Sequence, residues 1–377
     1  LKLGVVPTPA VAYLVRTHGA DAGVMISASH NSVEFNGIKL FAATGYKLPD
    51  AIEAEIEALI LDHPEQITLQ SGTAVGAISE YANAKEDYIS YLASCIVADC
   101  TGMRVVLDCA NGSSSATAES LFTRLGAEVH MLSASPDGTN INKNCGSTHM
   151  ENLMEYVKTH ECDLGLAFDG DADRLLAVDE NGKIVDGDKI MAIVGNFMKE
   201  KGTLKQDTIV VTVMSNLGFF LMAEKNGIQV DQTKVGDRYV LEHMKEIGAS
   251  LGGEQSGHII FLKENTTGDG LLSALHLLQV MVETGKPLSE LASVMEVLPQ
   301  ALVNAKVPNH KKEKYMEYPE IAGAIEKLTE KFAGEGRVLI RPSGTEPLVR
   351  VMIEGKDQQM IEKDARELAD LIQNIML

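Results

Sequence analysis

Three aspartates at alternate positions, Asp169, Asp171 and Asp173, are the strongest chemical signal in the sequence. They follow the apolar stretch 164–168, which is typical of a buried strand, and Gly170 loosens the loop between them. Such carboxylates can converge on one hard cation, and oxygen ligands with open positions suit Mg²⁺. Because three neighbouring carboxylates repel one another unless a cation neutralises them, the pattern predicts a magnesium site.

This segment has two other interpretations. Glu180 falls at position twelve of a calcium EF-hand loop, but position six is Arg174 rather than Gly, and the flanks are predicted strands. Residues 179–182 are better explained as a hairpin turn, in which an Asn-Gly pair supplies positive φ between strands 175–178 and 184–185. A purely structural acidic turn stays open on the residues alone.

The segment 26–32, Ile-Ser-Ala-Ser-His-Asn-Ser, places small hydroxyl residues directly after a short apolar strand. Ser29 lies where the end of the strand would expose it. An unactivated serine is a weak nucleophile and needs a partner, for which His30 is a neighbour and Lys39 lies on the following strand. The alternative is an ordinary polar turn.

A third polar loop, residues 252–258, again lies between apolar strands. Glu254 offers an acceptor, Ser256 a donor or acceptor, and His258 a group that titrates near neutrality. Such a loop could bind sugar hydroxyls, although glycine-bounded polar loops are common.

The fourth segment, residues 341–350, joins two predicted strands near the C-terminus. Its two arginines, two hydroxyls and the backbone N–H groups around Gly344 favour a phosphate dianion, since forked guanidinium donors and amide concavities both bind that charge. An ordinary hairpin turn would explain Pro342 and Gly344 but not the pair of arginines with the hydroxyls.

Composition limits the partners of the chain. Its 377 residues suffice for two to four domains. A formal charge of −20 repels nucleic acid phosphates and anionic membranes, so an anionic ligand must be bound locally. We expect a cytosolic location, because no apolar run approaches the roughly 20 residues of a spanning helix and no leader opens the sequence. The five cysteines form no zinc spacing and are expected to be reduced thiols: Cys95, Cys100, Cys109, Cys145 and Cys162.

These loops require strands and helices to position them. Strand–helix–strand units are predicted at 104–109, 116–125 and 127–132, and again at 208–213, 217–225 and 228–231. Before them we expect strands at 23–26 and 37–41 and a helix at 51–61. After 302 the order changes to a helix at 318–332, strands at 337–341 and 349–354, and a final helix at 358–375.

The predicted fold is α/β: three similar α/β domains, the first incomplete at its N-terminus, and a C-terminal α+β domain around a central cleft. The expected domain boundaries are 1–84, 85–184, 185–299 and 300–377. In this order the domains carry a serine loop (26–32), a metal loop (169–173), a sugar loop (252–258) and a phosphate loop (341–350). Because the sequence opens on Leu1 and runs straight into apolar residues, we expect an N-terminal segment to be missing.

In this order the four segments resemble the α-D-phosphohexomutase family, from Val5 to Leu377. The resemblance implies that Ser29 is the phosphorylated serine and that it holds Mg²⁺ together with the three aspartates. Lys39 and His258 are the candidates for catalytic proton transfer, and His30, the neighbour of Ser29, is a further catalytic candidate. The implied substrate-binding residues are Arg174, Gly236, Asp237, Arg238, Glu254, Gln255, Ser256, Arg341, Ser343, Gly344, Thr345 and Arg350.

Within the family, Gln255 and the stretch from 137 to 149 resemble the branch acting on glucosamine phosphates rather than the phosphomannose/phosphoglucose branch. Two departures stand out. Ser32 replaces a proline usual in the family, which can loosen the turn without removing a functional group, and the opening segment of the family, with its own arginine and glycine motifs, is absent.

The implied reaction interconverts glucosamine 6-phosphate and glucosamine 1-phosphate through a phosphoserine and a hexosamine 1,6-bisphosphate, which also serves as activator. It would supply UDP-N-acetylglucosamine and cell-wall synthesis. Sugar phosphates are the expected partners, nucleic acid and membrane are not, and a homodimer is compatible with the sequence. The alternatives are a phosphomannomutase or phosphoglucomutase, a magnesium phosphatase using Ser29, or a truncated sugar-phosphate-binding form without turnover.

Overall fold

The computed structural model of the chain describes residues 1–344 and 346–377, so Thr345 of the predicted phosphate loop lies outside the described residues. The chain divides into two compact units. The first comprises Leu1–Ser215 and Ala223–Val294, and the second comprises Asn216–Met222 and Met295–Leu377. Among the described residues, none of the helices has the length and apolar character needed to cross a membrane.

A five-stranded sheet in the first unit carries the aspartate loop. Its central strands are parallel, so the loops after β3 and β5 leave the same edge, while β6 and β7 add antiparallel pairs. Val106, Ala167 and Val178 face Leu153 and Val157 of helix α5 in a buried cluster. The strands, in sheet order, are β4 (Glu128–Leu132), β3 (Arg104–Asp108), β5 (Leu164–Phe168), β6 (Leu175–Asp179) and β7 (Ile184–Val185); the associated helices are α3 (Ala84–Cys95), α4 (Ala118–Arg124) and α5 (Glu151–Thr159).

A second sheet in the same unit has four strands and carries the sugar loop between β10 and β11. Val210 and Ile260 pack against Val240 and Met244 of helix α8. In sheet order the strands are β11 (Ile259–Phe261), β10 (Leu251–Gly253), β8 (Thr208–Thr212) and β9 (Gln229–Thr233); the helices are α6 (Gly187–Glu200), α8 (Asp237–Ile247), α9 (Gly270–Thr284) and α10 (Leu288–Ala292). Helix α7 (Leu217–Lys225) begins within the segment Asn216–Met222 of the second unit.

The serine loop joins the two strands of a small antiparallel sheet, β1 (Ala22–Ile26) and β2 (Ile38–Ala42). Helix α1 (Thr8–Thr17) covers one face, where Gly23 allows its valines to approach closely. The alternation of side chains places Val24 and Ile26 on the other face, where they are 58% and 75% exposed. The sheet therefore packs through one face only, and helix α2 (Asp50–Glu57) follows it.

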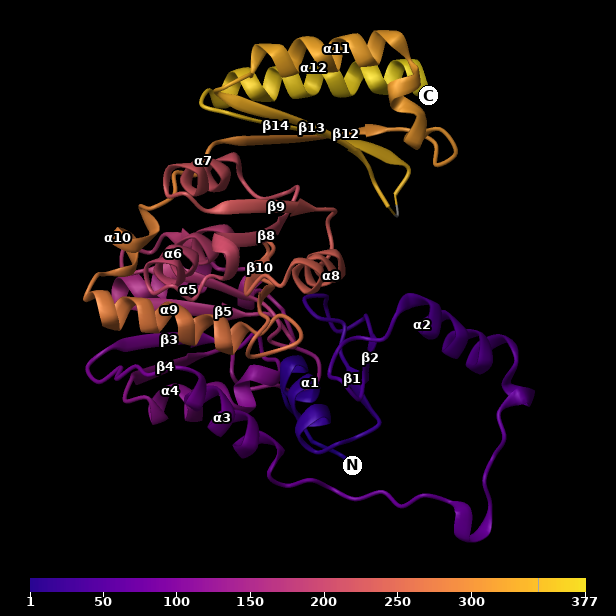
Figure 1. Cartoon of the computed structure of the whole chain (residues 1–377), viewed down its shortest axis with the longest axis vertical. Helices are drawn as coiled ribbons and strands as arrows, with labels where there is room; N and C mark the ends of the chain where they lie inside the picture. The colour runs from indigo at the N-terminus through magenta and orange to yellow at the C-terminus, as the bar shows by residue number, and fades with distance from the viewer. Residues whose placement is uncertain (345) are drawn as a thin grey trace. The chain divides into compact units, whose positions relative to one another are not determined.

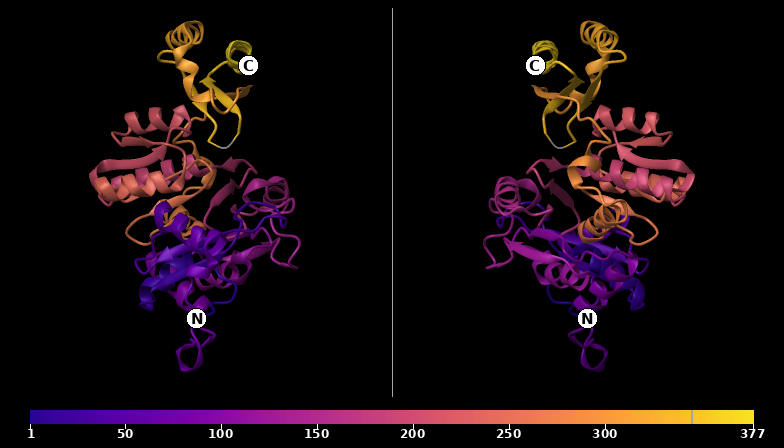
Figure 2. Two further views of the ribbon diagram at one scale, coloured as in Figure 1. Left: turned by 90° about the vertical axis from the view of Figure 1, so that its right-hand side faces the viewer. Right: turned by 90° about the vertical axis from the view of Figure 1, so that its left-hand side faces the viewer.

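The C-terminal unit is a three-stranded antiparallel sheet with two helices over one face (Figures 1 and 2). Its strand order is β12 (Gln300–Lys306), β14 (Leu348–Gly355) and β13 (Gly336–Pro342), and the helices are α11 (Pro319–Lys331) and α12 (Gln358–Met376). Val349, Val351 and Ile353 face the helices in the core. By the period of two, Arg350 and Glu354 lie on the opposite face of β14.

The structure confirms the α/β character of the chain and most of the predicted elements, with ends shifted by one or two residues. Helix α1 was not predicted. The predicted helix at 51–61 is α-helical only through Glu57 and continues as a single π-helical segment, Ala58–Asp62. The turn between β6 and β7 is correct in place, but only its glycine, Gly182, has a positive φ, of 77°, so the prediction that the Asn-Gly pair supplies it was wrong for the asparagine.

Candidate active site

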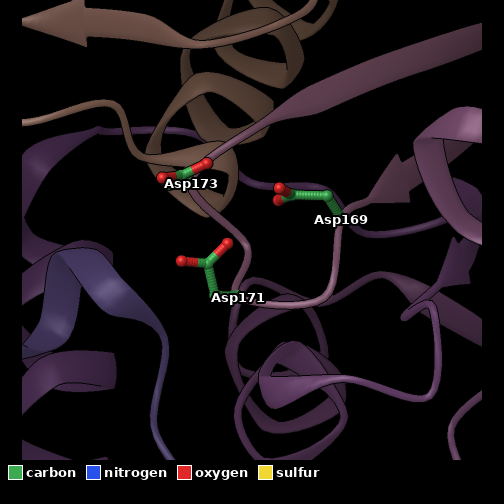
Figure 3. A group of neighbouring side chains, drawn as sticks. All are labelled: Asp169, Asp171 and Asp173. Carbon is green, nitrogen blue, oxygen red and sulfur yellow. The ribbon is translucent and has the colours of Figure 1, made fainter. Parts of the chain in front are cut away.

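Asp169, Asp171 and Asp173 converge from one loop after β5, as Figure 3 shows. Their exposed fractions are 1%, 0% and 3%, and one oxygen from each lies within 4.8 Å of the others. The loop is fixed by its own backbone, since the Arg174 N–H donates to Asp169 Oδ1 at 3.2 Å, and Ala172 takes a left-handed conformation with φ 56°. Three buried acids are thus held at one point.

The aspartate cluster fits a metal ion. Burial and the charges of Asp173 and Asp171 raise the pKa of Asp169 well above its ordinary value, so the neighbouring cations do not offset all three carboxylates. Within the described part of the chain, Asp171 Oδ1 and Asp173 Oδ1 are buried without a hydrogen bond. A divalent cation adds the remaining positive charge and can use these oxygens, which accept no hydrogen bond, as ligands.

The Ser29 hydroxyl lies against this cluster and donates a hydrogen bond to Asp169 Oδ2 at 2.7 Å. Ser29 has a φ of 55°, a conformation that non-glycine residues adopt rarely and that is often found at functional sites. The Ser27 hydroxyl accepts a bond from the Ser29 N–H at 2.9 Å, and Gly37 accepts one from the Ser27 N–H at the neck of the loop. The predicted nucleophile and the predicted metal ligands are therefore neighbours.

Asn142 was missed by the sequence analysis as a functional residue. Its buried amide donates to the carbonyls of Ser29 and Asn31, at 2.9 and 2.7 Å. Gly170 leaves room for this contact, since a Cβ at that position would meet the Ser29 carbonyl at 2.5 Å. Asn142 lies in the stretch 137–149, whose resemblance indicates only the branch of the family. It ties the serine loop to the segment after β4, where the Asn142 N–H donates to the Ala110 carbonyl at 2.9 Å.

Asn142→Ala is expected to lower kcat on the order of 10- to 100-fold with little change in KM, because phosphoryl transfer loses rate steeply when the serine is misplaced by about 1 Å. Asn144→Ala is the matched control: both asparagines have positive φ, of 57° and 54°, but Asn144 is exposed. Steady-state kinetics of the two variants provide the test. Equal losses in both would assign the effect to backbone strain.

Lys39, on the strand after the serine loop, contacts the aspartate cluster, which the sequence analysis did not predict. Its ammonium donates to Asp171 Oδ2 at 2.5 Å and to Asp173 Oδ2 at 2.9 Å. Burial opposes its charge, but Asp173 and Asp171 outweigh burial and raise the pKa of Lys39 above its ordinary value. In this arrangement Lys39 keeps its proton. Thr8, at the start of α1, donates its hydroxyl to Asp171 as well.

His258 lies between two carboxylates. Its Nδ1 is 3.6 Å from Asp173 Oδ1 and its Nε2 is 3.6 Å from Asp237 Oδ2, while the Gly268 N–H donates to Nε2 at 3.1 Å. Lys47 donates to Asp237, and although burial opposes ionisation, His258 and Lys47 lower the pKa of Asp237 to about 2. A pocket of about 350 Å³ opens beside this group, with Lys47, Asp237 and His258 in its lining. Sequence reasoning gave no sign of Lys47.

The sugar loop is fastened to its neighbours in the first unit. The Leu175 N–H donates to the Gly257 carbonyl at 3.0 Å, which ties the loop to the strand that follows the aspartates. Glu254 accepts a bond from the Gly236 N–H at 3.0 Å, and Gln255 donates to Asp186 at 3.2 Å. Ser256 is exposed at the tip. The predicted sugar residues are thus grouped near the metal loop.

Three other residues that were predicted to act in the site also lie in the first unit. Arg174 lies with its Nε 4.0 Å from Asp173 Oδ1. The guanidinium of Arg238 is engaged by Asp50 and by Glu242, so its substrate-binding role stays a prediction. His30 is exposed beside Ser29, and its catalytic role also stays a prediction.

In the C-terminal unit, Arg341 and Arg350 are directly opposite each other on β13 and β14. Like charges across a strand pair are destabilising unless an anion is shared, and burial together with the charge of Arg350 lowers the pKa of Arg341. Arg350 also pairs with Glu346 at 2.8 Å. The Ser343 side chain is buried, and apart from Gly344 and its chain neighbours no described residue lies within 4 Å of the Cβ position at Gly344. This loop can cradle an anion.

Sequence models of four domains match successive parts of the chain. They are described as phosphoglucomutase/phosphomannomutase alpha/beta/alpha domain I at residues 1–66, domain II at 86–182, domain III at 186–298 and the C-terminal domain at 302–371. The chain belongs to the phosphoglucomutase/phosphomannomutase family. This membership confirms the resemblance to the phosphohexomutases and the class of fold, three α/β domains and a C-terminal domain.

Known members of the phosphoglucomutase/phosphomannomutase family are close in sequence and fold. A phosphoglucosamine mutase of Ruminiclostridium cellulolyticum is 57% identical over 373 residues, which cover 99% of this chain and 83% of that protein. A family member of Burkholderia thailandensis shares the fold at a TM-score of 0.79 and 22% identity, covering 98% and 82% of the chains. N-acetylphosphoglucosamine mutase of Aspergillus fumigatus, solved with GlcNAc-6P and magnesium, has a TM-score of 0.75 at 20% identity, covering 98% and 93%.

Proposed function

We propose that this phosphohexomutase interconverts glucosamine 6-phosphate and glucosamine 1-phosphate, with Ser29 as the phosphorylated residue. The observation that carries the proposal is the hydrogen bond from the Ser29 hydroxyl to Asp169 inside the buried aspartate cluster. The 57% identity to a phosphoglucosamine mutase over nearly the whole chain supports the choice of sugar.

The proposed reaction consists of two phosphoryl transfers. First, the bond between phosphorus and the Ser29 oxygen breaks while the free hydroxyl oxygen of the sugar phosphate bonds to phosphorus and loses its proton to a base. The hexosamine 1,6-bisphosphate then turns over, and the Ser29 oxygen bonds to its other phosphorus while the bond from that phosphorus to the sugar oxygen breaks. The released sugar oxygen takes up the proton that the base received in the first step. The net result moves the phosphate between positions 6 and 1 of the sugar.

The residues of the chain divide this work. Asn142 and Ser27 hold Ser29 in place, and protonated Lys39 places a positive charge beside the transferring group. We propose Mg²⁺ as the cation of the aspartate cluster; when bound there, it would neutralise charge on the phosphoryl oxygens. The A. fumigatus enzyme was solved with magnesium, which supports Mg²⁺ as the metal, and with GlcNAc-6P, which supports an amino sugar phosphate as the substrate.

Comparison of turnover with glucosamine, mannose and glucose phosphates tests the choice of sugar. We expect kcat/KM for glucosamine 6-phosphate to exceed that of the other two 6-phosphates. A preference for mannose or glucose 6-phosphate would instead assign the chain to the phosphomannomutase or phosphoglucomutase branch of the family.

Arg350→Ala is expected to raise KM by about tenfold or more at nearly unchanged kcat, because this residue is assigned to the phosphate that does not react and is bound alike in ground and transition states. Arg366→Ala, an exposed arginine on α12, is the control and should change neither constant. A fall in kcat at constant KM would argue for a catalytic role of Arg350.

A further inference from the structure

One buried lysine in the C-terminal unit has no place in the site described so far. Lys312 is 7% exposed, and it is the one buried lysine of residues 1–344 and 346–377. No carboxylate of these residues lies within 4.0 Å of its ammonium. Because a buried charge is costly unless it is paired or fully hydrogen-bonded, its position needs a reason.

The ammonium of Lys312 is bound by the back of the predicted phosphate loop. It donates to the carbonyl of Ser343, and it lies 3.5 Å from the carbonyl of Gly344 and 3.3 Å from that of Glu346. Lys312 begins a short 3₁₀ helix, Lys312–Glu317, that is fixed to the sheet by a hydrogen bond from Tyr315 to the Ile340 carbonyl at 3.2 Å. The lysine therefore holds the carbonyls of the phosphate loop against a helix that is itself bonded to the sheet.

Holding these carbonyls sets the direction of a backbone donor. In a trans peptide the C=O and the following N–H point in opposite directions. When the Ser343 carbonyl faces Lys312, the Gly344 N–H must point away from the lysine, and the missing side chain of Gly344 leaves that position open. An outward N–H beside two arginines is the donor that an anion-binding loop requires.

We propose that Lys312 is a positioning residue for the phosphate loop: it orients the Gly344 N–H toward the non-reacting phosphate of the substrate and adds a positive charge behind it. Lys312 itself does not touch the phosphate. Its charge, which no described carboxylate neutralises, adds to those of Arg341 and Arg350. The proposal rests on the function proposed above, since it takes this loop to be the phosphate site.

Kinetics of Lys312→Met separate positioning from general stability. This variant removes the charge and the donors at similar length, and KM for the sugar phosphate is expected to rise about tenfold or more, because the loop loses the charged hydrogen bonds that orient the Gly344 N–H. We expect kcat to stay within about twofold. Lys314→Met removes the same charge from an exposed position of the same 3₁₀ helix and should leave KM unchanged.

The Gly344 amide signal in nuclear magnetic resonance spectra of the full chain, titrated with inorganic phosphate, gives a second readout. We expect the wild-type signal to shift with phosphate, and that of Lys312→Met to start elsewhere and respond at about tenfold higher concentration. Lys312→Arg, which keeps the charge with a different geometry, decides the matter if Lys312→Met does not fold: its KM should rise less than tenfold, with a displaced Gly344 signal.

Unchanged KM and an unchanged Gly344 signal in a folded Lys312 variant would overturn the proposal. That failure differs from failure of the proposed function. If the loop does not bind phosphate, the wild-type Gly344 signal itself will not respond, whereas a wrong assignment of Lys312 leaves the wild-type response intact and identical in the variant.

Discussion

Ser29→Ala is expected to abolish mutase turnover, with a loss on the order of 10⁶ in kcat, because removal of a nucleophile leaves no atom to accept and return the phosphoryl group. Binding of sugar phosphate should stay nearly unchanged, since the arginine loop at 341–350 is a separate part of the chain. The measurements are steady-state turnover and calorimetric binding of glucosamine 6-phosphate.

Ser32→Ala is the control for this variant. Ser32 is an exposed hydroxyl of the same loop, three residues away, and the hydroxyl that meets Asp169 belongs to Ser29. We expect Ser32→Ala to retain activity. Near-normal turnover in Ser29→Ala would remove Ser29 from the mechanism.

Asp171→Asn should lower magnesium affinity by about 100-fold or more and turnover at limiting magnesium accordingly. Mutation of a residue that only hydrogen-bonds a metal ligand typically lowers metal affinity or activity 10- to 100-fold, and this change removes the charge of a ligand itself. The metal-free protein should not lose stability, because one of three mutually repelling carboxylates becomes neutral and Lys39 keeps its bond to Asp173. Magnesium titration of activity and thermal melting without metal test the two parts.

Asp179→Asn is the control for Asp171→Asn. Asp179 is a buried aspartate outside the cluster, and its side chain accepts bonds from the Asn181 and Lys183 N–H groups in the turn after β6. Its replacement should lower the melting temperature and leave the magnesium dependence unchanged. An Asp171→Asn variant with unchanged magnesium dependence would mean that the cluster is not the metal site.

Much of the fold was predictable because local patterns agree with it. Apolar runs such as 164–168 form buried strands, and the period of two in β14 separates core valines from Arg350. The conformation of the 58–62 segment was not predictable, because a π-helical segment of five residues is too short for its apolar spacing to distinguish it from the end of an α-helix.

The types of the site residues could be inferred from sequence, but their neighbours could not. Ser29 and Asp169 are 140 positions apart, and only the tertiary fold brings them to 2.7 Å. Asn142 had no local sign of its hydrogen bonds to the serine loop. Lys312 lies in a segment with several lysines, which predicts an exposed surface. Only the structure shows that Lys312 is the buried one among them.

The mass of the intact protein before and after incubation with a hexose 1,6-bisphosphate tests the central claim most directly. The account predicts a gain of one phosphoryl group in the presence of Mg²⁺, found by peptide mapping on Ser29 and absent from Ser29→Ala. A phosphoryl group mapped to any other residue, or a turning-over enzyme that never carries one on Ser29, would contradict it.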